Sequence, residues 1–261
     1  MIGIFDSGIG GLTVARALIK SLPEYDILYF GDTARTPYGT KSPETVVQYA
    51  IEDAKFLIEK GAQILVVGCN TASSVATEKL RESFDMPIFE VISPAVHEVV
   101  SDNHGKRVGI IGTRATINST VYQDKIKAAR PDIKVFTAPC PLLVPLVEEG
   151  WLNRSETRKI VKRYLYPLKL KQIDMLILGC THYPLLKDII QAKIGKRVKI
   201  IDSSETMSDT VKNFLADNPH VANRLSKKGT HRIFVSDITD HIQKLASTIL
   251  KDANKLEHIK L

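Results

Sequence analysis

The chain has 261 residues, 44% of them hydrophobic and 25% charged, a composition typical of a folded globular protein rather than a disordered or fibrous one. Its 36 Lys and Arg against 29 Asp and Glu give a net charge of +7, and the sequence has no run of about 18 apolar residues that would cross a membrane. The first residues lack the pattern of a secretion signal, and three cysteines without a CxxC spacing do not make a disulfide framework, so we expect a cytoplasmic protein with free thiols.

Short apolar runs alternate with amphipathic stretches along the chain. Most of the apolar runs lack period-two alternation, which is typical of strands covered on both faces. The predicted strands are Ile2–Phe5, Ile27–Phe30, Ile64–Val67, Ile88–Val91, Arg107–Ile111, Lys134–Thr137, Met175–Leu178, Lys199–Ile201 and Ile233–Ser236. The predicted helices are Gly11–Lys20, Pro43–Lys60, Ala72–Ser83, Asn118–Ala129, Ser155–Lys169, Pro184–Ile194, Thr206–Leu215 and Thr239–Leu250. This succession predicts an α/β fold with mainly parallel sheets, in which ligands collect at the carboxyl ends of strands.

The first predicted strand runs into the glycine-rich sequence DSGIGG at 6–11. Glycine allows close backbone approach, and the start of the next helix offers free N–H groups to an anion. The spacing is not a dinucleotide fingerprint, because the third glycine of GxGxxG would fall at Thr13, and the Lys of a P-loop is missing. The turn suits a small anion such as a carboxylate, or it is an ordinary turn in which Asp6 caps a helix.

Two Gly-Cys motifs each follow a four-residue apolar strand, and Cys69 continues into NTAS while Cys180 continues into THYP. A thiol at the carboxyl end of a strand and beside a helix N-terminus lies where its anion is stabilised. One such cysteine alone would more often be a small buried hydrophobic residue. Two cysteines in matched contexts indicate a shared role.

The chain also has a loose internal duplication. The sequence GIFDSG at 3–8 resembles VGIIGT at 108–113, and LVVGCNT at 65–71 resembles LILGCTH at 176–182. Asp6 and Cys69 are 63 residues apart, and Thr113 and Cys180 are 67 apart. Chance similarity of buried strands is one explanation. The other is a pair of similar α/β domains, which by facing each other would place the two thiols on opposite sides of one cleft.

Two equivalent thiols limit the chemistry. Disulfide exchange usually employs cysteines close in sequence, but these are 111 residues apart, and acyl transfer needs only one nucleophile with one His. Zinc could find ligands in Cys69, Cys140, Cys180 and His182, but their spacing is not finger-like. Stereo-inversion at a carbon acid fits best, because one group removes a proton from one face while a second delivers a proton to the other. A thiol, with an ordinary pKa of about 8.5, can serve in both roles near neutral pH.

Several polar groups could tune the thiols. His182 follows Cys180 by two residues, Asp6 opens the glycine-rich turn, and the acidic pair Glu148–Glu149 lies in PLVEEG at 145–150. Each could equally be an ordinary satisfied or solvated side chain. The turn PYGT at 37–40 could offer backbone N–H groups or be a simple loop. Cys140, between two prolines, lacks the Gly-Cys context and is interpreted as structural.

Taken together, these motifs resemble those of the glutamate racemases, within the aspartate/glutamate racemase superfamily. The motifs keep the family's order and span almost the whole chain: DSGIGGLTV (6–14), GDTARTPYGTKS (31–42), VGCNTAS (67–73), IGTRATI (111–117), PLVEEG (145–150) and LGCTHYPLL (178–186). CNTA and GCTHYPLL are highly specific in combination. Gly68 stands where many members have Ala, and residues 240–261 carry no motif.

The resemblance implies a cofactor-independent isomerase that interconverts L- and D-glutamate and supplies D-glutamate for peptidoglycan, with no metal. It implies Cys69 and Cys180 as the catalytic acids and bases, assisted by Asp6, His182 and Glu148. No Lys lies in a motif that suggests a pyridoxal Schiff base. Substrate contacts are implied for Asp6, Ser7, Tyr38, Gly39, Asn70, Thr71, Thr113, Thr116, Thr181 and His182.

The same resemblance implies two similar α/β domains that are pseudo-symmetric about a central cleft. The first would comprise residues 1–97 and 207–261, and the second, residues 98–206, would be inserted in it. Members of the family are usually homodimers, so we expect a homodimer here. From the residues alone, a racemase that acts on aspartate or another small acid stays an alternative, because the sequence does not display the pocket.

The uneven charge raises an alternative of another class. Residues 1–99 contain 8 Lys and Arg against 13 Asp and Glu, a net of −5, whereas residues 100–261 contain 28 against 16, a net of +12. A basic region of this kind is consistent with binding to nucleic acid or to DNA gyrase, with which some family members are associated. The basic residues are dispersed and not interleaved with aromatic ones, which favours an ordinary solvated surface.

Overall fold

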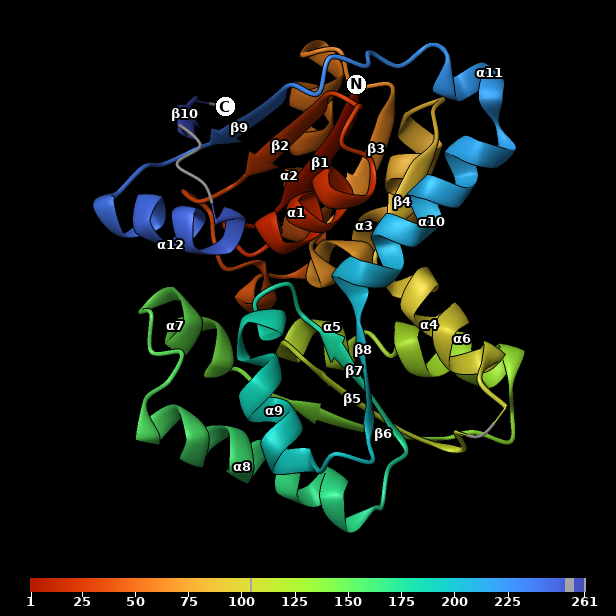
Figure 1. Cartoon of the computed structure of the whole chain (residues 1–261), viewed down its shortest axis with the longest axis vertical. Helices are drawn as coiled ribbons and strands as arrows, with labels where there is room; N and C mark the ends of the chain where they lie inside the picture. The colour runs from red at the N-terminus through yellow and green to blue at the C-terminus, as the bar shows by residue number, and fades with distance from the viewer. Residues whose placement is uncertain (104, 252–255, 261) are drawn as a thin grey trace.

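The computed structural model describes residues 1–103, 105–251 and 256–260 (Figure 1). The strands are β1 (Ile2–Asp6), β2 (Ile27–Gly31), β3 (Ile64–Val67), β4 (Ile88–Glu90), β5 (Arg107–Gly112), β6 (Lys134–Pro139), β7 (Met175–Gly179), β8 (Lys199–Asp202), β9 (His231–Val235) and β10 (Leu256–His258). The α-helices are α1 (Leu12–Ser21), α2 (Pro43–Glu59), α3 (Asn70–Ser83), α4 (Ile92–Ser101), α5 (Arg114–Asn118), α6 (Val121–Ala129), α7 (Leu143–Glu148), α8 (Ser155–Leu170), α9 (Lys187–Ile194), α10 (Ser203–Asp217), α11 (Pro219–Ala222) and α12 (Asp240–Leu250). Two 3₁₀ turns complete the set, η1 (Tyr38–Thr40) and η2 (Tyr183–Leu186).

The strands form two separate parallel sheets, which lie one above the other in Figure 1. The first has the order β10-β9-β2-β1-β3-β4 and the second the order β6-β5-β7-β8. The segment β2-β1-β3-β4 therefore has the same order as β6-β5-β7-β8, with β1 equivalent to β5 and β3 to β7. This repeat confirms the predicted α/β fold with two similar, mainly parallel domains.

Helices cover both faces of each sheet. In the first sheet, apolar residues of α1, α10 and α12 pack on one face, and those of α2 and α3 pack on the other. In the second sheet, α7, α8 and α9 cover one face, while α4 and α6 cover the other. Burial on both faces explains why the central strands are continuous apolar runs, with every residue of β1, β3 and β7 buried.

The distribution of the strands supports a discontinuous first domain. The first sheet takes its strands from residues 2–90 and 231–258, and the second from residues 107–202. The predicted boundaries at 97/98 and 206/207 fall inside α4 and α10, the two helices that link the sheets in the chain. These boundaries stay a prediction.

Several predicted elements differ from the structure. Helices α4, α5, α7 and α11 and strand β10 were not expected from the sequence, because α4 and α7 contain proline within apolar runs and the others are short. Strand β9 begins at His231, two residues earlier than predicted. The helix predicted over Asn118–Ala129 is broken by Thr120, whose φ of 58° is left-handed, and α6 starts only after it. Helix α3 begins at Asn70 rather than Ala72, directly after Cys69.

Candidate active site

The repeated strand order gives each sheet a point at which successive connections leave in opposite directions, and ligands of parallel α/β sheets bind at such points. In the first sheet this point lies between β1 and β3, where Asp6 ends β1 and Cys69 follows β3. In the second sheet it lies between β5 and β7, where Thr113 follows β5 and Cys180 follows β7. The four motifs of the internal duplication thus occupy equivalent places in the two domains.

These two sets of strand ends meet in one small pocket. Both thiols lie on it, so the structure brings Cys69 and Cys180 together from opposite domains. Both cysteines are free and nearly inaccessible to solvent, with 5% and 6% of their surface exposed. The lining comprises Ser7, Thr36, Pro37, Gly39, Cys69, Asn70, Thr71, Thr113, Val144, Gly179, Cys180, Thr181 and His182.

Cys69 is held by uncharged groups. Its sulfur caps α3 by accepting the backbone N–H of Ala72 at 3.4 Å, and its thiol donates to the Ser7 hydroxyl at 3.6 Å. Burial, with a smaller contribution from the nearby Asp6 carboxylate, raises the pKa of Cys69 to about 12. At neutral pH, Cys69 is therefore a protonated thiol.

Asp6 lies behind this thiol rather than on the pocket wall. Its carboxylate is fully buried and accepts hydrogen bonds from the backbone N–H of Gly8 at 3.1 Å and from the Thr181 hydroxyl at 3.2 Å. Burial raises the pKa of Asp6, and the charge of His182 opposes that shift. Since Thr181 belongs to the second domain's motif, Asp6 connects the two halves of the site.

Cys180 has a charged neighbour. Its sulfur lies 3.8 Å from Nδ1 of His182, and Nε2 of the same ring lies 3.2 Å from a Glu148 carboxylate oxygen, at an angle unlike that of a hydrogen bond. Burial alone would lower the pKa of His182, but its contacts with Cys180 and Glu148 outweigh burial and raise that pKa to about 10. At neutral pH, His182 is an imidazolium between a sulfur and a carboxylate.

Hydroxyl and amide groups from both domains meet beside the thiols. The hydroxyls of Thr71, Thr113 and Thr116 lie 3.0–3.3 Å from one another. Asn70 accepts a hydrogen bond from the Tyr122 hydroxyl at 2.6 Å, so the first turn of α3 is fixed against the second domain. A cluster of hydroxyl donors of this kind is suited to a substrate carboxylate.

The loop at 36–39 forms one wall of the pocket, and a buried ionic network holds it from behind. The Tyr38 hydroxyl oxygen lies 2.5 Å from a carboxyl oxygen of Asp32 and 2.9 Å from one of Asp53, within hydrogen-bond distance of both, and both carboxyl groups are fully buried. Arg35 pairs with Asp32 at 2.6 Å, with Asp53 at 3.0 Å and with Glu52. Tyr38 therefore turns its side chain away from the pocket, and only backbone of this residue could reach a ligand.

The predicted site residues separate into two groups. Those that line the pocket are Ser7, Gly39, Cys69, Asn70, Thr71, Thr113, Cys180, Thr181 and His182. Asp6, Thr116 and Glu148 lie one contact behind it, and Tyr38 points elsewhere. The sequence reasoning missed Thr36, Pro37, Val144 and Gly179, although Thr36 and Pro37 lie inside a quoted motif and Val144 is on a helix that was not predicted.

Two glycines permit the close approach of the domains. A side chain at Gly10 would bring its Cβ within 2.5 Å of the His182 ring, and one at Gly39 would meet Thr113 at 2.8 Å. Cβ contacts this short do not occur in folded proteins, so these positions have room for glycine only. Gly10 of the glycine-rich turn therefore allows the first domain to pack closely against His182 of the second domain.

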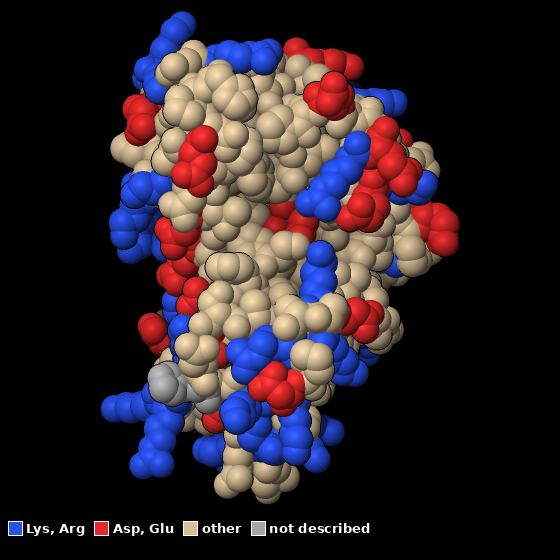
Figure 2. All heavy atoms as spheres, turned by 90° about the vertical axis from the view of Figure 1, so that its right-hand side faces the viewer, with Lys and Arg blue, Asp and Glu red and all other residues tan. Residues whose placement is uncertain are grey.

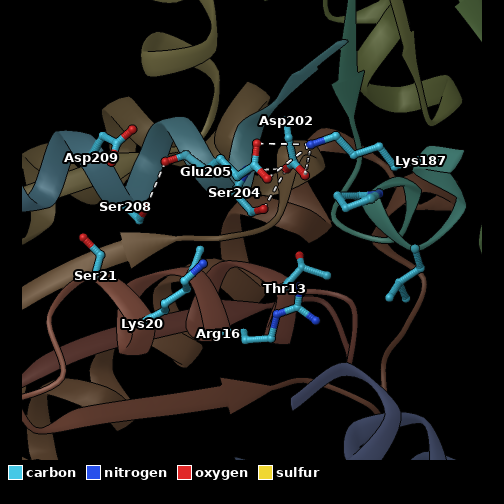
Figure 3. Close-up of a pocket in the computed structure, with 13 residues that line it drawn as sticks. Thr13, Arg16, Lys20, Ser21, Lys187, Asp202, Ser204, Glu205, Ser208 and Asp209 are labelled. Carbon is cyan, nitrogen blue, oxygen red and sulfur yellow. Dashed lines mark hydrogen bonds and ion pairs between the residues drawn. The ribbon is translucent and has the colours of Figure 1, made fainter. Parts of the chain in front are cut away.

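A second groove between the domains is lined from α1, η2 and α10 and shares no lining residue with the thiol pocket (Figure 3). At this groove Lys187, the first residue of α9, pairs with Glu205 at 3.2 Å and with Asp202, the last residue of β8, at 3.9 Å. The Thr13 hydroxyl donates to the Thr181 carbonyl at 3.1 Å, which connects this side of the molecule to the second Gly-Cys turn.

The remaining surface shows the charge asymmetry of the sequence. In Figure 2, Lys and Arg crowd the lower part of the molecule, which is the second domain, while the upper part is more mixed. Contact with nucleic acid or gyrase stays a prediction. Within the residues that the structure describes, no His, Cys, Asp and Glu side chains gather in a group suited to a metal ion, and no helix has the length and apolar character to cross a membrane.

Comparison with known proteins agrees with this geometry. The family model for Asp/Glu/Hydantoin racemase matches residues 12–209. The chain is 47% identical to the glutamate racemase of Geobacter metallireducens over 91% of this chain and 87% of that protein, and 46% identical to that of Persephonella marina over 100% and 97%. A crystal structure of glutamate racemase from Francisella tularensis in complex with D-glutamate superposes with a TM-score of 0.92 at 38% identity, covering 99% of this chain and 97% of that one.

The paired α/β domains, the site between them and these likenesses define an isomerase of the racemase class. The two-domain fold is that of the solved glutamate racemases. More particularly, the chain belongs to the Asp/Glu/hydantoin racemase family, and within it to the glutamate racemases, as the motifs predict.

Proposed function

We propose that this protein interconverts L- and D-glutamate by a two-base proton transfer at the α-carbon, without a cofactor. The observation that carries the proposal is the presence of Cys69 and Cys180, from equivalent turns of opposite domains, on one pocket. Two acid–base groups on opposite sides of a bound carbon are what stereo-inversion requires. The names of the relatives support glutamate as the substrate.

In this mechanism one cysteine, as thiolate, accepts the α-proton, and the other, as thiol, delivers a proton to the opposite face. The carbon gains one proton and loses one, so the substrate changes only in configuration. The two sulfurs exchange protonation states in each turnover. The reverse reaction uses them in the opposite roles, which is why chemically equivalent groups are suitable.

The contacts around each sulfur support different resting roles. Burial raises the pKa of Cys69, so this residue begins as the thiol that donates a proton. Cys180 lies beside the imidazolium of His182, with 3.8 Å between its sulfur and Nδ1 of the ring, and in the proposed mechanism it is the partner that accepts the α-proton. His182 and Glu148 act as positioning groups for Cys180, and Asp6 links both halves through Thr181.

The difficult step is removal of a weakly acidic α-proton. Without an electron sink, the charge that develops on the substrate carboxylate must be stabilised by fixed donors in a water-poor site. The hydroxyls of Thr71 and Thr113 and the backbone of the 36–39 loop are suited to this because they are fixed by contacts on both domains.

The proposal is tested by incubating the protein with L-glutamate, without added cofactor and with a metal chelator, and following the circular dichroism of the amino acid. We expect the signal to decay to that of the racemate. L-Aspartate is run alongside, since a racemase specific for the shorter acid would act on it instead. A constant signal from L-glutamate would contradict the proposal.

We further propose that the protein acts in the cytoplasm as a homodimer and supplies D-glutamate for peptidoglycan. This role follows from the function proposed above. Mass measurement by light scattering tests the dimer. A requirement for external D-glutamate in a host cell that lacks its own racemase, relieved by this gene, tests the cellular role.

A further inference from the structure

Thr36 lies on the wall of the thiol pocket, and the mechanism proposed above gives its side chain no role. It lies on the loop between β2 and η1, and it lines the pocket together with Ser7 and Cys69. A Cβ placed on Gly8 would come within 3.1 Å of the Thr36 hydroxyl oxygen, so this oxygen lies directly over the glycine-rich turn. The hydroxyl therefore faces the half of the site that contains Cys69.

The Thr36 hydroxyl oxygen is shielded from solvent, and within the described part of the chain it has no hydrogen-bond partner. Buried hydroxyls are normally bonded, because leaving one unpaired is unfavourable. The other pocket hydroxyls contrast with it, since Ser7, Thr71, Thr113 and Thr181 each have at least one partner. An unpaired donor on the wall of a pocket is a group that a ligand can satisfy.

The loop cannot easily turn this hydroxyl elsewhere. Arg35 precedes it and is anchored to two buried carboxylates, Asp32 and Asp53. Tyr38 follows two residues later and hydrogen-bonds the same two carboxylates. Both flanks of Thr36 are thus fixed from behind, which presents its side chain to the pocket in a defined position.

We propose that Thr36 is a substrate-binding residue whose hydroxyl donates a hydrogen bond to a carboxylate oxygen of the bound amino acid. This inference rests on the proposed racemisation and adds a contact to its first-domain half. A hydroxyl and a carboxylate form a charge-assisted bond, and the donor is already desolvated and oriented before the substrate arrives. Binding therefore satisfies a group that the empty protein leaves unpaired.

The test compares Thr36→Val, which keeps the shape and removes the hydroxyl, with Thr36→Ser, which keeps the hydroxyl. For Thr36→Val we expect the KM for glutamate to rise about tenfold, with a smaller change in kcat, as for loss of a hydrogen bond to a charged group. Thr36→Ser should stay within about threefold of the unchanged protein. The same pair is measured by calorimetric titration with D-glutamate.

Thermal unfolding of the ligand-free variants gives an independent readout. Because Thr36→Val removes an unpaired buried hydroxyl, its Tm should rise by about 2 °C. Thr77→Val is the matched control: Thr77 is also buried, but its hydroxyl donates to the Ser73 carbonyl at 2.8 Å and lies outside the pocket. That variant should have a lower Tm and an unchanged KM.

The outcomes separate the inference from the function on which it rests. If the unchanged protein racemises glutamate but Thr36→Val has the same KM and the same affinity for D-glutamate, the inference is wrong. A fall in the Tm of ligand-free Thr36→Val would also overturn it, because the hydroxyl would then have a partner in the empty protein. Absence of racemisation in the unchanged protein contradicts the proposed function, whereas the titrations still decide the role of Thr36.

Discussion

The two halves of the pocket have the same backbone plan but different electrostatics. Cys69 follows β3 and Cys180 follows β7, each of which is the third strand of its domain in chain order. Both cysteines precede a helical turn. Around Cys69 lie a hydroxyl, a backbone N–H and, behind them, a buried carboxylate. Burial, with a smaller contribution from that carboxylate, keeps the sulfur protonated. Around Cys180 lies an imidazolium supported by Glu148.

The difference indicates how a duplicated fold supports a reaction that needs unequal partners at every instant. One sulfur must be a thiol while the other is a thiolate, and the different neighbours of the two sulfurs bias which of them begins as the thiol. The strand order places the two cysteines at equivalent positions. Neighbouring residues then make the electrostatic surroundings different, with the positive charge of His182 beside Cys180 and the carboxyl group of Asp6 behind Cys69. Each substitution below alters one half of the pocket or the contact between the two halves.

The largest effect is expected when either sulfur is removed. Cys69→Ser and Cys180→Ser should each lower kcat for racemisation by about 10³-fold, because a serine hydroxyl is a much weaker acid than a thiol and a poor proton acceptor. Cys140→Ser is the matched control, since Cys140 is buried, its thiol donates to the Ala138 carbonyl and it does not line the pocket. If either site variant kept kcat within tenfold of the unchanged protein, the two-thiol mechanism would be excluded.

A second variant acts on the contact between the halves. Gly10→Ala places a methyl group within 2.5 Å of the His182 ring, which cannot move freely because Glu148 lies on its other side. The domains must then separate, and displacement of Cys180 by about 1 Å lowers kcat by about a hundredfold. Steady-state kinetics measure the loss, and a kcat equal to that of the unchanged protein would show that the halves need not approach this closely.

A third variant reduces the asymmetry itself. Glu148→Gln removes the carboxylate that supports the imidazolium, so the pKa of His182 should fall from about 10 toward its ordinary 6.5, and kcat should fall about tenfold. The pKa is measured by an NMR titration of the imidazole. Because the pKa is raised in the folded state, the stability that this group contributes is complete below pH 6.5 and is lost as the pH rises toward 10. If the pKa of His182 were unchanged in Glu148→Gln, Glu148 would not be the group that stabilises the imidazolium.

The smallest effect on activity is expected from Tyr38→Phe. Its hydroxyl bonds Asp32 and Asp53 and points away from the pocket, so the free energy of unfolding should fall by about 2 kcal/mol while kcat/KM changes less than about threefold. Denaturant unfolding and steady-state kinetics on the same preparation separate these quantities. A large rise in KM without loss of stability would instead favour direct contact between the Tyr38 hydroxyl and the substrate.

The sequence predicted the central strands and the meeting of the two thiols at one pocket, for a physical reason. Buried parallel strands such as Ile64–Val67 are apolar throughout, and the residues that follow them must lie at one edge of the sheet. Proximity of Cys69 to Cys180 followed from the internal duplication, which the matching strand orders confirm. Residues adjacent to these strand ends, including Ser7 and Thr113, were predicted and do line the pocket.

Other features of the site could not be predicted from the sequence, because they depend on the direction of side chains and on contacts between residues far apart in the chain. Tyr38 lies in a recognised motif, yet packing decides whether its side chain faces the pocket or the carboxyl groups of Asp32 and Asp53. Helix α7, which carries Val144 to the pocket and Glu148 to His182, contains Pro145 and is too short for a periodic signal. Thr36 stands out only once every other buried hydroxyl of the pocket has been matched with a partner.

The central claim, that two different sulfurs act on opposite faces of the α-carbon, is tested most directly by isotope incorporation at early times. L-Glutamate is incubated with the protein in deuterium oxide, and deuterium at the α-carbon is measured separately in the L and D pools during the first few per cent of conversion. With two bases, the D-glutamate formed carries solvent deuterium while the remaining L-glutamate retains its proton. Equal early labelling of both pools would indicate a single base that serves both faces, and would contradict the account.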